Sequence, residues 1–478
     1  MSLARTALFP TYPSFWEELA THGEAPALID ADSGEVWNYR RLSHVLKVVA
    51  AQLDSRARQL ILVAADNDVG AVLYYLAALS AGHVVYVCGG GLNALSPALI
   101  ERYAPDIIIG KRAPAAAIPL SGYENTRSQF GYDVLRSPGR YGPVEAGIAL
   151  LLSTSGSTGS SKLVRLSGRN VAASTCQVRE ALLIQPEDRA ITSLPVSFVY
   201  GLSVVHSHLA AGASIVVTGR SVVDHLFWKA VRDWQVTSLA GVTWTYQTLR
   251  QMRFERKVPP SLRKLTHSGG KVDSALTAWL TDDMAALGMQ MYFMYGQTEA
   301  TGRISVLPPS MAASKRGAVG WPVLDGKIQC SPEREIIYSG PNVMLGYCTC
   351  RDDLVGTDEM RGTLSTGDIG FVDGDGCLFI TGRASRLCKL LGQRVNLDEI
   401  ESFLRETEDV AVTSDDNVLE IFAARELSAT FPDRIEKHAT QLGVPQHKIV
   451  THTIRNLPRT DSGKIRYQDL HTLIEYEA

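Results

Sequence analysis

A hydroxyl-rich segment is the clearest candidate for chemistry: Ser153–Lys162 reads STSGSTGSSK and follows the apolar run IALLL. Gly156 and Gly159 lack side chains and let the backbone approach a ligand closely. Backbone N–H groups, hydroxyls and the Lys162 ammonium can together surround phosphate oxygens. The spacing G-x-x-G-x-x-K differs from the Walker spacing, which disfavours a P-loop kinase or GTPase. A flexible linker is the alternative, but the position between a strand-like run and the helix-length segment Arg169–Leu183 favours a phosphate-binding loop.

Four other segments carry residues suited to phosphate chemistry: Ser268–Lys271 (SGGK), Tyr295–Glu299 (YGQTE), Ser365–Asp368 (STGD) and Leu457–Lys464 (LPRTDSGK). Mg²⁺ prefers hard carboxylate oxygens and bridges phosphates. A lysine on a loop can neutralise the charge that builds on a phosphate in a transition state. Taken singly, each segment also has an ordinary explanation, because Gly-Gly pairs usually form turns and lone Asp or Lys residues are usually solvated.

The five segments, in this order, resemble the motifs of the adenylate-forming (ANL) superfamily, which contains acyl- and aryl-CoA ligases, adenylation domains and luciferases. The first segment resembles the signature T-S-G-[ST]-T-G-x-P-K-G and departs from it at Ser161 and Leu163, which stand where the signature has Pro and Gly. The resemblance covers nearly the whole chain. It implies a layered α/β core that binds ATP and a small C-terminal domain that moves.

The resemblance also implies roles for individual residues. Thr298 would contact the α-phosphate, Glu299 would hold Mg²⁺, and Lys464 would be the catalytic lysine of adenylation. Asp368 and Arg383 would bind the ribose. The nucleotide site implied in this way comprises Thr154, Ser155, Gly156, Ser157, Thr158, Gly159, Lys162, Gly269, Gly270, Lys271, Tyr295, Gly296, Gln297, Asp368 and Arg383.

In the family, the small domain rotates between adenylation and thiol transfer. The loop that faces the thiol corresponds to Lys389–Arg394, where Lys389 and Gly392 would lie near a pantetheine arm and Gly392 would allow close approach to the backbone. The hinge position, usually Asp or Lys in the family, is Ser385 here. A small polar residue can still absorb the required change in backbone angles.

The acid pocket implied by the resemblance includes the run Phe198–Gly201. Val199 stands where amino-acid-activating domains carry an Asp, and an α-ammonium buried there without a carboxylate would be costly. The apolar run therefore favours a lipophilic or aromatic acid over an α-amino acid. His206 and His208 are expected on one face of a strand or extended run, as ordinary structural histidines. The acid-pocket candidates are Phe198, Val199, Tyr200, Gly201 and Trp244, with core packing as the alternative for Trp244 and Tyr246.

The surrounding pattern predicts the elements that hold these residues. Apolar runs separated by helix-length segments predict buried parallel strands and α/β layering. From about Gly326 short strands with Gly-rich turns predict a β-rich subdomain, and we expect residues 1–382 to form the adenylation core and residues 383–478 the mobile domain. The predicted strands are Gln59–Ala65, Val84–Cys88, Asp106–Gly110, Ile148–Leu152, Ala190–Leu194, Ala213–Thr218 and Thr237–Ala240, with helices over Val69–Ala81 and Leu92–Tyr103.

Composition limits the partners. The 478 residues include 45% hydrophobic and 20% charged residues with a net charge of -3, which gives no reason to expect nucleic acid or an anionic membrane as partner. No run of about eighteen apolar residues and no signal-peptide pattern is present. The seven cysteines are scattered and form no C-x-x-C pair, which predicts a reduced, cytoplasmic protein without structural zinc.

The sequence therefore predicts an AMP-forming ligase that adenylates a small carboxylic acid with ATP and Mg²⁺ and passes the acyl group to a thiol, most simply coenzyme A. Two alternatives keep every motif: an amide-bond synthetase, in which an amine attacks the adenylate, and an enzyme that loads a carrier protein. A non-catalytic nucleotide-binding homologue is disfavoured because Lys464, Glu299 and Asp368 are all present.

Overall fold

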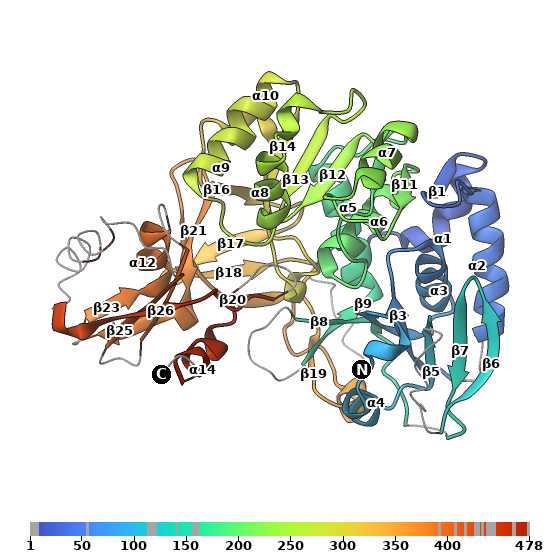
Figure 1. Cartoon of the computed structure of the whole chain (residues 1–478). Helices are drawn as coiled ribbons and strands as arrows, with labels where there is room; N and C mark the ends of the chain where they lie inside the picture. Colours follow the sequence, from blue (N-terminus) through green and yellow to red (C-terminus); the bar gives the residue numbers. More distant parts are fainter. Residues whose placement is uncertain are drawn as a thin grey trace.

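The computed structural model describes residues 9–53, 57–111, 122–139, 142–154, 162–390, 393–405, 409–414, 418–424, 431, 435, 446–460 and 465–475. Within these residues, one sheet of thirteen strands and one of eight form the large part of the molecule, and sheets of two and three strands lie near the C-terminus (Figure 1). Mixed α/β layering with a smaller C-terminal unit was the predicted fold class, and it is confirmed.

The eight-stranded sheet positions the hydroxyl-rich loop. β3 pairs with β4 and β5, and β4 with β8, all in parallel, as the apolar runs predicted. β8 continues beyond the loop into β9 as an antiparallel neighbour, and β19 joins the far side of β9. In sheet order the strands are β19 (Gly346–Cys348), β9 (Leu163–Ser167), β8 (Ile148–Ser153), β4 (Val84–Gly89), β3 (Leu60–Ala65), β5 (Ile107–Gly110), β7 (Tyr132–Arg136) and β6 (Glu124–Gln129).

The thirteen-stranded sheet combines a parallel half with an antiparallel half. β10 to β14 run in parallel, and the antiparallel strands from β15 onward include the predicted β-rich region. In sheet order the strands are β17 (Lys327–Cys330), β18 (Glu335–Ser339), β20 (Thr363–Val372), β21 (Leu378–Arg383), β16 (Ala318–Pro322), β15 (Ser305–Leu307), β14 (Gln290–Tyr295), β13 (Lys264–His267), β12 (Ser238–Gly241), β10 (Arg189–Ile191), β11 (Ser214–Val217), β1 (Pro26–Asp30) and β2 (Val36–Asn38).

Buried helices separate the two large sheets. Eleven consecutive residues of α3, Val69–Leu79, are buried, and most of α6 is buried as well. Helices that are apolar all round belong inside a protein, and one core cluster joins residues of β3 to residues of β11 through them. The helices of this region are α1 (Phe15–Glu18), α2 (Tyr39–Leu53), α3 (Val69–Ser80), α4 (Pro97–Tyr103), α5 (Gly168–Ala181), α6 (Val199–Ala210), α7 (His225–Asp233), α8 (Thr243–Gln251), α9 (Ser274–Ala278), α10 (Met284–Ala286) and α11 (Pro309–Ala312).

The residues beyond Arg383 form small elements with cores of their own. β22 and β23 make a hairpin, β24 and β25 pair in antiparallel, and β26 joins β25 in parallel. Two core clusters draw only on residues from Cys388 onward. The elements are β22 (Leu387–Leu390), β23 (Gln393–Asn396), α12 (Leu397–Leu404), β24 (Val410–Ser414), β25 (Leu419–Ala424), β26 (Ile449–Ile454) and α14 (Leu470–Glu475).

One local prediction was wrong. The segment Leu92–Tyr103, expected as one helix, is a short turn, η2 (Leu92–Ala94), followed by α4. Ser96 caps α4 and Pro97, which has no N–H to donate, occupies its first position, so the helix begins there. The helix-length segment Arg169–Leu183 is confirmed as α5, and the strand β9, for which there was no prediction, stands between the hydroxyl-rich loop and this helix. No helix of the described residues is long and apolar enough to cross a membrane.

Candidate active site

The hydroxyl-rich loop joins two adjacent antiparallel strands. Ser153 pairs with Leu163, so the loop spans the end of a hairpin, unlike a P-loop, which leads from a strand into a helix. Thr154 and Lys162 are its described ends. Five of the predicted phosphate ligands, Ser155, Gly156, Ser157, Thr158 and Gly159, lie outside the described residues.

Tyr347 connects the loop to the predicted magnesium ligand. The Lys162 ammonium nitrogen lies 3.7 Å from the centre of the Tyr347 ring. The Tyr347 hydroxyl donates a hydrogen bond of 3.0 Å to Glu299 Oε1. β19, which carries Tyr347, reaches this place because it pairs with β9, the strand that begins beside Lys162. One aromatic side chain therefore holds the lysine and the carboxylate near the same point, and motif analysis did not identify it.

The Tyr295–Glu299 segment forms a tight turn at the end of β14. A side chain at Gly296 would clash with the backbone of Gly302, so only glycine fits. Asn342 fixes the returning chain through hydrogen bonds from its amide to the carbonyl oxygens of Ala300 (2.7 Å) and Arg303 (2.6 Å). Thr298 is buried in the turn, while Glu299 is partly exposed. The strand-end turn and the predicted ligand-binding segment are thus the same structure.

Tyr295, Asp368 and Arg383, predicted from separate motifs, meet in the structure. The Tyr295 hydroxyl donates to Asp368 Oδ2 at 2.6 Å, and Arg383 Nε lies 3.2 Å from Asp368 Oδ1. β20 and β21 pair Asp368 directly with Arg383. Burial raises the pKa of Asp368 above its usual value. Each carboxylate oxygen has lone pairs left to accept hydroxyl hydrogens, as a ribose would require. The side chain of Gln297 also turns toward this strand and donates to Thr366 O at 3.3 Å.

The glycine pair lies at the same edge of the sheet. Gly269 and Gly270 have φ values of 85° and 110°, which side chains rarely allow, and a Cβ on Gly270 would lie 2.9 Å from Thr243 Oγ1. Lys271 follows as an exposed residue. Because β12, β13 and β14 are parallel neighbours, their carboxyl ends bring this turn beside Tyr295. Open α/β sheets bind ligands at this edge.

The acid-pocket candidates divide into exposed and packed residues. Phe198 precedes α6 and is half-exposed, as is Trp244 on α8. Val199 contacts the turn, since a Cβ on Gly302 would lie 3.1 Å from it, and Gly201 packs against the backbone of Pro195. Tyr200 is buried and its hydroxyl donates to Thr266 O at 2.8 Å. Tyr246 also donates to that oxygen and belongs to the core.

The prediction that His206 and His208 share one face of a strand was wrong, because both lie in α6, where residues two apart point to different sides. His206 Nε2 lies 2.8 Å from the Tyr75 hydroxyl. His208 bonds Val204 O at 2.9 Å and Ser238 Oγ at 3.2 Å. Burial lowers their pKa values to about 3 and about 4, so both are neutral at neutral pH. Their role is structural, as expected.

The predicted residues of the small C-terminal part are only partly described. Lys464 and Gly392 lie outside the described residues, and Lys389 belongs to β22. Ser385 lies in a single turn, η7 (Ala384–Arg386), directly after the strand that carries Arg383. The backbone N–H of Arg383 donates to Asp398 Oδ2 at 3.0 Å, so this junction is tied to the start of α12.

Comparison with known proteins assigns the class. The model of the AMP-binding enzyme family matches residues 106–348, about half of the chain, and this chain belongs to that family. It is 30% identical to the 2-succinylbenzoate–CoA ligase of Bacillus pumilus over 267 residues, and this match covers 54% of this chain and 53% of the relative. It is 27% identical to the 2-succinylbenzoate–CoA ligase of Bacillus cereus over 342 residues, and this match covers 68% of this chain and 70% of the relative. The chain thus matches about half the length of the first of these relatives.

Solved structures show the same fold. The O-succinylbenzoate coenzyme A synthetase MenE of Bacillus subtilis in complex with AMP superposes with a TM-score of 0.75 at 22% identity, over 96% of this chain and 98% of that one. The same enzyme in complex with ATP and magnesium gives 0.75 at 20% identity, over 97% and 100%. The two-part architecture of this chain is therefore the fold of these solved structures.

Proposed function

We propose that this protein is an AMP-forming acid–thiol ligase. A carboxylate oxygen of the acid attacks the α-phosphorus of ATP and pyrophosphate leaves, which gives an acyl-adenylate. A thiol then attacks the acyl carbon, and a thioester forms while AMP leaves. The observation that carries the proposal is that Lys162 and Glu299 meet at Tyr347, while Tyr295, at the start of the turn that holds Glu299, meets Asp368. Those groups suit a phosphate, a cation and a ribose.

The donor set around Glu299 suits Mg²⁺. This ion is usually held by one or two carboxylates together with substrate phosphates. Glu299 offers one carboxylate, partly exposed and oriented by the Tyr347 hydroxyl, next to the phosphate-binding loop. Bound Mg²⁺ would neutralise phosphate charge. Thr298 would contact the α-phosphate, and Gly269 and Gly270 would lie along the base.

The acceptor that we propose is coenzyme A, because the relatives are named as CoA ligases; neither a carrier protein nor an amine has comparable support. The half-exposed Phe198 and Trp244 support an acid with a lipophilic or aromatic body. We place the reaction in the cytoplasm, in keeping with seven cysteines that are scattered along the sequence and form no C-x-x-C pair.

The second half of the reaction rests on domain rotation. We propose that residues 1–382 bind ATP and the acid, that residues 383–478 rotate about Ser385, and that Lys464 serves adenylation in one orientation. Lys389 and Gly392 would serve thiol transfer in the other. The separate cores on the two sides of Arg383 support two bodies joined at this point.

One variant tests this division. Purified protein with Mg²⁺, ATP and a suitable acid should exchange labelled pyrophosphate into ATP. Lys464→Ala should lower this exchange by about 10²–10³-fold, the usual cost of removing one placed donor, yet bind ATP and still transfer the acyl group from a supplied acyl-adenylate to CoA. Lys448→Ala, in the same part of the chain, is the matched control. Unchanged exchange in Lys464→Ala would remove this lysine from the mechanism, and failure of every acid would refute the ligase.

A further inference from the structure

Arg303 is a buried arginine that has no carboxylate partner among the described residues. Its exposed fraction is 1%. The guanidinium stacks on the Tyr200 ring, with 4.2 Å from Cζ to the ring centre, donates to Gly302 O, and lies 3.4 Å from Ser203 Oγ. Its Nε has no hydrogen-bond acceptor, and no acidic side chain lies within ion-pair distance, among the described residues. Such a charge is costly to bury alone.

The charge of Arg303 persists at neutral pH. Burial lowers the pKa of the guanidinium only to about 10, so the side chain stays protonated under physiological conditions. Tyr200, the ring beneath it, has its pKa raised to about 12 and stays neutral. The stacked pair therefore carries one net positive charge inside the large domain.

This charge faces a cavity of about 20 Å³, enough for a water-sized group. The lining includes Tyr200, Ser203, Ser207 and Thr266 besides Arg303. Lys264 also lines it, but its ammonium is paired with Asp188 at 3.2 Å. His208, a further lining residue, is neutral because burial lowers its pKa to about 4. Among the described residues that line the cavity, Arg303 is thus the cation left uncompensated.

The cavity lies directly behind the proposed site of adenylation. A Cβ on Gly296, in the Tyr295–Glu299 turn, would lie 2.8 Å from the Arg303 Cα. Val199 packs against Gly302, the residue before the arginine. Arg303 therefore lies behind the turn that carries Thr298, and Tyr200 belongs both to the cavity lining and to the predicted acid pocket.

We propose that the acid of this ligase carries a second carboxylate, which Arg303 binds at the inner end of the acid pocket. Arginine matches a carboxylate with two parallel hydrogen bonds, and such a partner would satisfy the free Nε and compensate the buried charge. The Ser203 hydroxyl donates to Tyr200 O at 2.8 Å and accepts from Arg303, so it orients the guanidinium at the same end. The proposal rests on the ligase function above and narrows its substrate to dicarboxylic acids with a lipophilic or aromatic body.

The test compares two acids that differ by one carboxylate: 2-succinylbenzoate and 4-oxo-4-phenylbutanoate, which lacks the carboxylate on the ring. Wild-type protein should show the higher kcat/KM for pyrophosphate release with the dicarboxylate. In Arg303→Met this preference should fall by at least about 30-fold, the lower range for truncating one member of a buried charge pair. Arg250→Met, which removes an exposed arginine of α8, is the matched control and should keep the preference. A series of linear dicarboxylates and their monocarboxylate counterparts extends the test to other body shapes.

The outcomes separate the two proposals. If every acid fails to release pyrophosphate, the ligase is refuted, while a dicarboxylate that raises the melting temperature of wild type and not of Arg303→Met would still support the anion site. Equal losses with both acids, or a wild-type preference for the monocarboxylate across the series, would overturn the role of Arg303 and leave the ligase intact. If Arg303→Met does not fold, Arg303→Gln and the wild-type preference decide the question.

Discussion

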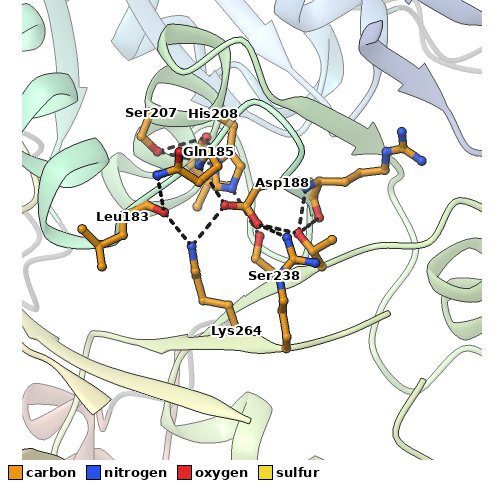
Figure 2. Close-up of polar contacts among 11 residues, drawn as sticks. Leu183, Gln185, Asp188, Ser207, His208, Ser238 and Lys264 are labelled. Carbon is orange, nitrogen blue, oxygen red and sulfur yellow. Dashed lines mark hydrogen bonds and ion pairs between the residues drawn. The ribbon is translucent and has the colours of Figure 1, made fainter. Parts of the chain in front are cut away.

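Lys264 and Arg303 line the same cavity, but only Lys264 has a carboxylate partner among the described residues. Lys264, 5% exposed, meets Asp188, which is 2% exposed and also binds Arg263 at 2.9 Å. Figure 2 shows Lys264 pointing at Asp188 beside His208 and Ser238. Arg303, which also lines the cavity, has hydroxyl, carbonyl and ring contacts and no carboxylate among the described residues.

The difference between Lys264 and Arg303 distinguishes a structural ion pair from a candidate binding residue. Burial pushes the pKa of Asp188 up, but the backbone N–H of Gln185 and the Lys264 ammonium hold it below its usual value, so the pair stays ionised and complete within the protein. A complete buried pair locks its strands together and leaves nothing for a ligand. An incomplete one is costly until a partner arrives, which is the signature of a binding residue.

The largest expected effect comes from breaking the complete pair. Asp188→Asn leaves Lys264 charged and unpaired, and we expect a loss of about 3–5 kcal/mol in the free energy of unfolding. Chemical denaturation at neutral pH measures it. Asp233→Asn, which breaks the exposed Lys229–Asp233 pair, is the control and should cost at most about 0.5 kcal/mol.

A double variant sharpens the same prediction. Asp188→Asn combined with Lys264→Met removes both charges, so it should be more stable than the sum of the single effects by about 1–3 kcal/mol. Additive losses would show that the two charges do not stabilise each other.

A smaller effect is expected from acid, through the neutral histidine beside this pair. The pKa of His208 is lowered by burial from 6.5 to about 4, with Asp188 raising it and Lys264 lowering it in smaller measure. Below pH 6.5 His208 binds a proton in the unfolded chain but stays neutral in the folded chain until about pH 4. The contribution of His208 to the free energy of unfolding therefore falls as the pH drops toward 4. At about 1.4 kcal/mol for each pKa unit, the loss is about 3 kcal/mol.

The difference between wild type and His208→Asn isolates that contribution. Denaturation measured from pH 7 to pH 4.5 should show a shallower decline in the variant. His225→Asn, at an exposed histidine, should follow wild type. Parallel curves for wild type and His208→Asn would mean that His208 is protonated in the folded state.

Features set by residues close together in the sequence could be predicted from it, whereas features set by contacts between distant residues could not. Tyr295, Asp368 and Arg383 were found because each belongs to a short segment, and the structure brings them together. The strand β9 was missed because Arg165 interrupts its apolar pattern. That arginine is buried and paired with Glu359, nearly two hundred residues away, so the interruption looks like an exposed charge in the sequence.

The histidines and Arg303 were misjudged or overlooked for related reasons. α6 is apolar on nearly all sides, and a buried helix of this kind cannot be told from a strand by periodicity. Arg303 sits in the loop TGRIS, where a charge is ordinarily solvated. Its burial and its lack of a carboxylate partner among the described residues can be seen only in the folded structure. Tyr347 was missed because its partners, Lys162 and Glu299, lie on other strands and turns.

The smallest expected effect on stability is that of Arg303→Met, and it tests the contrast between Arg303 and the paired cations. Arg303→Met removes a costly buried charge, and methionine can keep a contact with the Tyr200 ring. Against this gain stand the lost hydrogen bonds to Gly302 O and Ser203. We expect the free energy of unfolding, without ligand, to stay within about 1 kcal/mol of wild type, because the two contributions have similar size.

Arg165→Met is the matched control, since Arg165 is equally buried but has a carboxylate partner. Because Glu359 is 60% exposed, this variant mainly removes the hydrogen bonds of Arg165 to Glu359 and Asp353 O, and it should cost about 1–3 kcal/mol. If Arg303→Met loses as much stability as Arg165→Met, Arg303 is a structural residue whose charge the protein itself compensates. If only Arg165→Met is destabilised, the folded chain does not depend on the Arg303 charge, which is the result expected for a residue that binds a ligand.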